Sequence, residues 1–299
     1  MEAVEAKVST RDGLSIFLRA WVAPEPERIV VCVQGLGGHG GYYAELAEHL
    51  GKAGTALVAP DLRGHGHSAG KRGDIDRFDR YLEDVEAAVI WARECWPGKL
   101  VILLGESMGA SIAIQYTLQA AQQPATAPAG LILLAPVLRP AIQPSFSEAA
   151  RFLRSLVLHP TRPTMPTSGR EELGCRDDAF NTRLRADPLF VRHVSVRFLN
   201  TLTFWLWRTR RKASQVALPL LVIRGEQDRV AHPAGTAAFY RRVRATQRSF
   251  LIIPEAYHCL LYDPKTPAVV DALNAWLAEH TTAAQVQPLP AVGKTLLAE

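Results

Sequence analysis

The sequence predicts an α/β protein, with a mostly parallel central sheet and helices on both faces of that sheet. Short apolar runs rich in Val, Ile and Leu alternate with longer segments whose apolar residues recur at helical spacing. Several short runs are apolar throughout, as expected for strands buried on both faces of a parallel sheet. Strands alternating with helices in this way are typical of a layered α/β architecture.

The elements follow one another along most of the chain. Residues 4–9 and 14–22 flank Arg11-Asp12-Gly13, which predicts two strands joined by a tight turn. Further strands are expected over 29–33, 56–59, 100–104, 131–134, 220–223 and 250–253. Helices are expected over 43–50, 78–92, 110–114, 234–243 and 270–277.

The stretch 137–215 interrupts this alternation. It contains an amphipathic segment around 152–157, a very apolar segment over 198–207, and several prolines, among them Pro140, Pro144, Pro160, Pro163 and Pro166. Because it leaves and re-enters between two expected strands, we interpret it as a helical cap inserted into a core of residues 1–136 and 216–280. Residues 281–299 are rich in Ala, Thr and Pro and are expected to form a flexible tail.

Composition limits the classes of protein that the chain can represent. Its 299 residues are 48% hydrophobic, with a net charge of +5, and this mild basic excess is expected mainly on solvated helix faces. Anionic lipid or an acidic substrate is the alternative partner, whereas nucleic acid is not expected because no exposed aromatic stripe accompanies the charges. The four cysteines lack C-x-x-C spacing, which disfavours a zinc site and suits a reducing compartment. With neither a signal-peptide pattern nor 18 consecutive apolar residues, we expect a soluble cytoplasmic protein.

The pentapeptide Gly105-Glu106-Ser107-Met108-Gly109 is the most informative motif. It follows the expected strand 100–104 and precedes an apolar helical segment. A sharp strand-to-helix turn would expose the Ser107 hydroxyl, and flanking glycines permit close backbone approach there. Glu106 is expected to point away from that hydroxyl and to hydrogen-bond within the protein.

A nucleophilic serine needs an imidazole base and a carboxylate that orients the imidazole. His258 alone among nine histidines falls just after the last expected strand, so it is the predicted base. Asp228 follows the strand 220–223 and is the predicted acid, with Glu226 as the less favoured alternative. The backbone amides of Met108 and Leu36 are expected to form the oxyanion hole.

The chain resembles the α/β-hydrolases of the monoacylglycerol lipase and lysophospholipase-like group, which is of serine aminopeptidase S33 type. The resemblance covers residues of roughly 30 to 280. The matching segments are Gln34-Gly35-Leu36-Gly37-Gly38-His39, Asp61-Leu62-Arg63-Gly64-His65-Gly66-His67-Ser68, the serine pentapeptide, Asp187-Pro188-Leu189, Gly225-Glu226-Gln227-Asp228 and Tyr257-His258. One departure is Gln34, where the group usually has histidine, and it bears on the oxyanion turn rather than on the triad.

The resemblance implies the α/β-hydrolase fold and a serine hydrolase that cleaves lipid-type esters such as monoacylglycerols or lysophospholipids through an acyl-enzyme. No cofactor is implied, and the group's loop accounts for His65 and His67 without a metal. The alternatives are an acyltransferase, a thioesterase, a small-peptide hydrolase, or a non-catalytic ligand-binding protein. The segment with Trp205 and Trp207 is interpreted as cap packing or as the lining of an acyl-chain tunnel, and the cap as a surface for peripheral contact with membrane or lipid aggregates.

Overall fold

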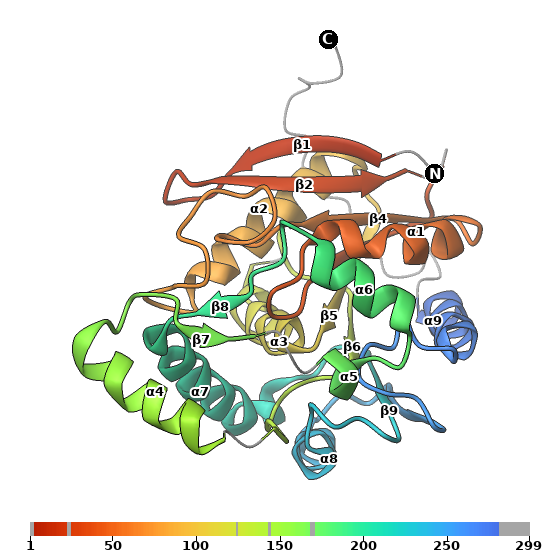
Figure 1. Cartoon of the computed structure of the whole chain (residues 1–299). Helices are drawn as coiled ribbons and strands as arrows, with labels where there is room; N and C mark the ends of the chain where they lie inside the picture. The colour runs from red at the N-terminus through yellow and green to blue at the C-terminus, as the bar shows by residue number, and fades with distance from the viewer. Residues whose placement is uncertain (1–2, 23–24, 124, 143–144, 168–170, 281–299) are drawn as a thin grey trace.

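The computed structural model describes residues 3–22, 25–123, 125–142, 145–167 and 171–280. These residues contain an eight-stranded sheet in the order β1-β2-β4-β3-β5-β6-β9-β10 (Figure 1). The strand β2 pairs antiparallel with both β1 and β4, whereas every pair from β4 to β10 is parallel. The prediction of a mostly parallel sheet is therefore confirmed.

The elements lie where the sequence pattern predicts them, and their observed ends differ from the predicted ends by a few residues. The strands of the large sheet are β1 (Ala3–Ser9), β2 (Ser15–Trp21), β3 (Arg28–Val33), β4 (Thr55–Pro60), β5 (Leu100–Glu106), β6 (Gly130–Leu134), β9 (Leu220–Gly225) and β10 (Arg248–Ile253). The helices beside it are α1 (Ala44–Gly51), α2 (Arg80–Cys95), α3 (Met108–Ala120), α8 (Pro233–Arg242) and α9 (Thr266–His280), with a 3-10 turn, η1 (Gly40–Tyr43), before α1.

Two hydrophobic cores cover the two faces of the sheet. On one face, side chains of α2, α3 and α8 pack on the strands, and on the other face those of α1 and α9 do so (Figure 1). Alternate residues of β3 point into opposite cores: Val31 and Val33 into the first, Val30 and Cys32 into the second. This two-sided burial explains why the strand sequences are apolar at every position.

The segment between β6 and β9 carries the elements that the sequence assigns to a cap, and we call residues 137–215 the cap segment. It contains α4 (Phe146–Leu158), β7 (Met165–Pro166), α5 (Glu171–Gly174), α6 (Asp178–Ala186), β8 (His193–Val194), α7 (Val196–Arg211) and η2 (Ala213–Gln215). It is mainly helical, as expected, although the small antiparallel β7–β8 pair was not predicted. The division into core and cap stays a prediction, and the expected tail, residues 281–299, lies outside the described residues.

Aromatic packing attaches α7 to the core. Phe78, just before α2, contacts Phe198 and Trp205, with ring centroids 5.2 and 5.7 Å apart. Trp205 is 2% exposed, which agrees with the packing interpretation, whereas Trp207 is 43% exposed and stacks on Phe204. The apolar side chains of α7 thus divide between the core and the molecular surface.

A buried carboxylate provides a second attachment. Asp74, in the loop before α2, accepts hydrogen bonds from the Ser195 hydroxyl and, at 3.1 Å, from Nε of Arg197 on α7, and Lys71 lies 3.1 Å from it. Burial alone would raise the pKa of Asp74, but the hydrogen bonds from Arg197, Ser195 and Lys71 outweigh burial and hold that pKa below its usual value. None of the helices in the described ranges is both long and apolar enough to span a bilayer.

The Asp74 attachment predicts acid sensitivity of α7. A lowered native pKa means that the unfolded chain binds the proton more tightly, so the stabilisation is present above about pH 4 and is lost as the pH falls further. We expect Asp74→Asn to lower the free energy of unfolding by about 1–3 kcal/mol at pH 7 and to flatten its pH dependence below pH 4. Thermal unfolding between pH 3 and 7, with exposed Asp178→Asn as control, measures both effects; equal pH dependence in the two variants would contradict the assignment.

Candidate active site

Ser107 lies at the turn between β5 and α3, as the sequence predicts. Its backbone has φ +53° and ψ −115°, a conformation that non-glycine residues rarely adopt. The surroundings hold it there, because the Ser107 amide donates to the Leu134 carbonyl at 2.9 Å and the Val137 amide donates to the Ser107 carbonyl at 3.2 Å. The turn is therefore fixed by the adjoining strand β6 and by the start of the cap segment.

Two glycines of the pentapeptide allow this turn by close packing rather than by unusual dihedral angles. A Cβ on Gly109 would lie 2.1 Å from the Val33 carbonyl oxygen, and one on Gly105 would lie 2.6 Å from the Ala110 Cα. Any larger residue would push α3 away from the ends of β3 and β5. The two glycines of G-x-S-x-G are therefore required because α3 lies so close to the ends of β3 and β5.

The three side chains predicted for the triad lie within hydrogen-bonding distance of one another. His258, in the loop after β10, places Nε2 2.9 Å from Oγ of Ser107 and Nδ1 2.8 Å from Oδ2 of Asp228, in the loop after β9. All three residues follow strands of the parallel segment of the sheet, so they gather at its carboxyl edge.

The second oxygen of Asp228 is held by the backbone. Oδ1 accepts hydrogen bonds from the amides of Val230 at 2.8 Å and Ala231 at 2.9 Å. Burial favours the neutral acid, but the charge of His258, the hydrogen bond to it and these two amides together lower the pKa of Asp228. Asp228 is consequently ionised near neutral pH and fixed in orientation beside the imidazole.

The two other carboxylates considered from the sequence lie elsewhere. Glu226 is exposed, and its Oε2 accepts a hydrogen bond from the Glu255 amide at 2.9 Å. Glu106 is partly buried and accepts a hydrogen bond from the Tyr43 hydroxyl at 2.9 Å. Burial raises the pKa of Glu106, with Tyr43 and His258 acting against that rise. Asp228 rather than Glu226 is thus the carboxylate at His258.

The glycine-rich turn after β3 passes directly beside Ser107. A Cβ on Gly35 would lie 3.1 Å from Cβ of Ser107. Nε2 of Gln34 donates to the Gly38 carbonyl across the turn, whereas Oε1 is buried with no partner in the described part of the chain. Gln34 therefore braces the turn with its amide nitrogen, and the Leu36 amide follows Gly35 at the position expected for the oxyanion hole.

The cap segment forms hydrogen bonds with this same turn. These contacts were not predicted from the sequence. Nε2 of His39 lies 2.9 Å from Oδ2 of Asp187, and the same oxygen accepts a hydrogen bond from the Tyr42 hydroxyl. The Val191 amide donates to the Gly37 carbonyl at 2.9 Å. Both partners lie in motifs that carry the family resemblance, His39 in the glycine-rich turn and Asp187 in Asp-Pro-Leu. The sequence gives no indication that these two motifs contact each other.

The histidines considered as metal ligands make separate contacts. Nδ1 of His65 lies 3.1 Å from the Arg63 carbonyl, and the ring of His67 packs edge-on against Phe17. Burial lowers the pKa of His65 to about 4, so its imidazole is neutral at pH 7. Within the ranges that the structure describes, no group of three or more His, Cys, Asp or Glu side chains could hold a metal ion.

Comparison with known proteins identifies the family of the chain. The model of the family described as serine aminopeptidase, S33, matches residues 24–265. The chain is 28% identical over 274 residues to monoacylglycerol lipase of Mycolicibacterium smegmatis, covering 90% of this chain and 94% of the relative. It is also 28% identical over 288 residues to human monoglyceride lipase, covering 91% of this chain and 90% of that relative.

Solved structures show the same fold. The monoacylglycerol lipase of Paleococcus ferrophilus has a TM-score of 0.73 and 25% identity, covering 94% of this chain and all of its own. A soluble variant of the Saccharomyces cerevisiae monoglyceride lipase, in complex with a substrate analog, has a TM-score of 0.81 and 19% identity, covering 94% and 97%. The predicted α/β-hydrolase fold is confirmed. Because the family model spans most of the chain, the protein belongs to the serine aminopeptidase S33 family of α/β-hydrolases.

Proposed function

We propose that the protein is a serine carboxylic-ester hydrolase that acts on lipid-type esters through an acyl-enzyme. The observation that carries this proposal is the pair of hydrogen bonds that joins Oγ of Ser107, the His258 imidazole and the Asp228 carboxylate at 2.9 and 2.8 Å. A serine hydroxyl becomes an effective nucleophile when an oriented imidazole can accept its proton.

In the first half of the reaction, Ser107 attacks the ester carbonyl while Nε2 of His258 accepts the hydroxyl proton. Asp228 keeps Nδ1 protonated and stabilises the imidazolium that forms. The Leu36 and Met108 amides are the proposed donors to the oxyanion, and the start of α3 at Met108 favours negative charge there. Loss of one such donor typically raises the barrier by about 3–4 kcal/mol.

In the second half, the imidazolium of His258 gives its proton to the departing alcohol, which leaves an ester between Ser107 and the acyl group. A water molecule then transfers a proton to the same Nε2 and attacks the acyl carbonyl. Collapse of this second tetrahedral intermediate releases the acid and restores the serine. These steps involve only groups of the chain, the substrate and water.

The relatives support a lipid substrate. Two of them are called monoacylglycerol or monoglyceride lipase and match along about nine-tenths of this chain. Lysophospholipids are the second substrate class in the proposal, since their single acyl chain and glycerol ester offer the same bond.

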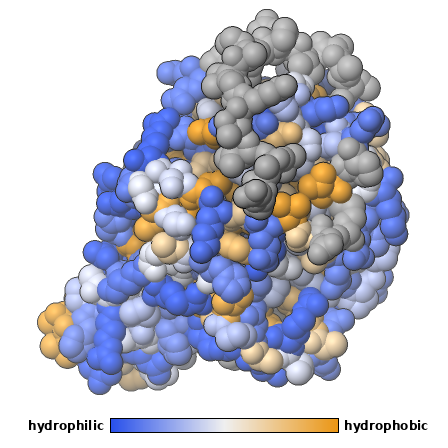
Figure 2. Space-filling model, turned by 90° about the horizontal axis from the view of Figure 1, so that it is seen from above, coloured by the Kyte–Doolittle hydropathy of each residue, from blue (hydrophilic) through white to orange (hydrophobic). Residues whose placement is uncertain are grey.

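The surface of the cap segment supports contact with lipid. Apolar side chains of α4 face solvent, with Phe146 91%, Leu153 62% and Val157 80% exposed. Figure 2 shows hydrophobic side chains protruding at the lower left, on the side of the molecule that carries α4 in Figure 1. Such a face suits peripheral docking on lipid aggregates. The cytoplasmic location stays a prediction.

The family description favours one competing function, the hydrolysis of small peptides, because the matched model is described as a serine aminopeptidase. The proposed triad could cleave either an ester bond or a peptide bond. Parallel assays with a monoacylglycerol and an aminoacyl p-nitroanilide separate the two functions, and faster cleavage of the anilide would replace ester hydrolysis as the conclusion. Product analysis with an added alcohol detects acyl transfer, and an acyl thioester offered as a third substrate tests thioester cleavage.

Ser107→Ala is expected to reduce ester turnover by about 10⁶-fold, because no other group can form the acyl-enzyme. A fluorophosphonate probe should label the wild-type protein and Ser147→Ala, an exposed serine of α4, but not Ser107→Ala. Labelling of the Ser107→Ala variant would contradict the assignment of the nucleophile. Absence of label on the wild type would favour the ligand-binding alternative.

Asp228→Asn is expected to lower kcat by about 10⁴-fold, because the amide can present a donor to Nδ1 and so select the wrong tautomer of His258. Glu226→Gln removes the same charge from the same loop after β9 and should change kcat less than about threefold, since Oε2 of Glu226 accepts a hydrogen bond from the Glu255 amide whereas His258 pairs with Asp228. Measurement of kcat with one soluble ester compares them, and the reverse ranking would assign the acid to Glu226.

Acyl preference tests the substrate class. If an apolar surface receives the acyl chain, kcat/KM for p-nitrophenyl esters should rise by up to about fourfold per added methylene until that surface is filled, because each buried methylene contributes about 0.8 kcal/mol. Acetyl to dodecanoyl esters measure this below their aggregation limits. A flat or falling series would contradict a lipid-type substrate.

A further inference from the structure

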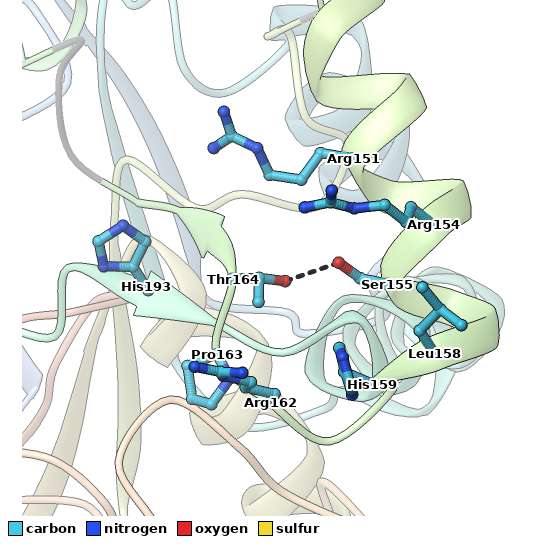
Figure 3. Close-up of a pocket in the computed structure, with 9 residues that line it drawn as sticks. All are labelled: Arg151, Arg154, Ser155, Leu158, His159, Arg162, Pro163, Thr164 and His193. Carbon is cyan, nitrogen blue, oxygen red and sulfur yellow. Dashed lines mark hydrogen bonds between the residues drawn. The ribbon is translucent and has the colours of Figure 1, made fainter.

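A basic pocket lies in the cap segment, between α4 and the β7–β8 pair (Figure 3). Its volume is about 570 Å³. Its lining includes the three arginines and two histidines that Figure 3 draws, Arg151, Arg154, Arg162, His159 and His193. None of these residues belongs to the proposed triad or to the oxyanion turn.

The three arginines of this pocket have no acidic partner among the described residues. Arg151 and Arg154 extend from α4, while Arg162 comes from the loop before β7 (Figure 3). Across the described ranges, no acidic side chain forms an ion pair with any of these three guanidinium groups. By contrast, Arg208 at the far end of α7 is paired with Asp79 at 2.6 Å. Repulsion among unpaired arginines at one pocket is relieved when an anion binds between them.

The floor of the pocket is polar and held in place. Oγ of Ser155 lies 2.9 Å from Oγ1 of Thr164, and this hydrogen bond joins α4 to the strand β7 (Figure 3). Ser155 is 4% exposed and Thr164 is half-buried, so the pair forms a partly buried link between Arg154 and Arg162 (Figure 3). The two walls that carry the arginines are thus held at a set separation, which preorganises them for a ligand.

The α4 side of the pocket also carries an exposed apolar side chain. Leu158 lines the pocket and is 60% exposed, and Val157 and Leu153 continue the apolar surface along the helix. A free phosphate ion would make no use of these side chains. A lipid would, because its phosphate can enter the basic pocket while its acyl chains lie against the exposed apolar face of α4.

We propose that this pocket binds the phosphate of an anionic phospholipid and thereby docks the cap segment selectively on anionic membranes. Arginine is suited to this role because its planar guanidinium can donate two hydrogen bonds to phosphate oxygens. Zwitterionic phosphatidylcholine is disfavoured because its ammonium group offsets the attraction of the arginines. The inference rests on the proposed lipid-directed function but concerns binding, which is measured without turnover.

The test compares two charge-matched double variants of the full chain. Arg154→Gln with Arg162→Gln removes one guanidinium from each wall of the pocket. Arg241→Gln with Arg244→Gln removes the same net charge from exposed positions at the end of α8. Sedimentation with vesicles of phosphatidylcholine, alone or with about 30 mol% phosphatidylglycerol, measures the partition constant of each protein.

We expect the wild type and the α8 variant to bind the anionic vesicles well above the neutral ones. The pocket variant should bind the anionic vesicles about 30-fold more weakly, because each arginine near an anionic surface contributes about fivefold. Equal losses in the two variants, or binding that does not depend on phosphatidylglycerol, would overturn the proposal. Thermal unfolding should be unchanged in both, since the substituted side chains are exposed.

Two further measurements separate the sources of phosphate and the two proposals. Inorganic phosphate could saturate the pocket at millimolar concentration while the protein binds both kinds of vesicle with equal affinity. That result would assign the pocket to a free anion and overturn the lipid proposal. Hydrolysis of a soluble p-nitrophenyl ester should be the same in all three proteins. If the wild type lacked this hydrolysis yet bound anionic vesicles selectively, the esterase proposal would fail and the docking proposal would stand.

Discussion

The close approach of α3 to the ends of β3 and β5 is the constraint on which the site depends. It requires glycine at 105 and 109, and it leaves Ser107 with φ +53° at the top of the sheet. This conformation is unfavourable in itself, but hydrogen bonds to β6 and from the cap segment hold it, and the first hydrophobic core packs α3 against the strands. The position of the hydroxyl is therefore a property of the whole sheet rather than of the pentapeptide.

Asp228 and Glu106 illustrate how environment separates groups of the same chemistry. Asp228 and Glu106 are each subject to burial, which favours their neutral forms. Asp228 receives a hydrogen bond from His258 and two more from backbone amides, and its pKa falls. Glu106 receives one from Tyr43, and its pKa rises. The number of donors that each carboxylate finds thus sets the direction in which its pKa moves.

The cap segment is joined to the core at polar points close to the site. Asp187 binds His39 and Tyr42 next to the oxyanion turn, and Asp74 binds Ser195 and Arg197 at the start of α7. The outer side of the same segment carries the exposed apolar face of α4 and the basic pocket. Contacts between the cap segment and the oxyanion turn come from Asp187 and Val191.

The order of strands and helices and the three side chains of the proposed triad could be predicted from the amino-acid sequence. Apolar periodicity records burial directly, and in a parallel sheet residues that follow successive strands must meet at one edge. The contacts between distant segments became visible in the three-dimensional structure alone. It shows that Asp187 pairs with His39 and that Arg154 and Arg162 line one pocket. It also shows that Trp205 is buried and Trp207 exposed. These outcomes depend on how the cap segment folds back over the sheet. Prolines interrupt its periodicity, so no spacing in the chain fixes those pairings.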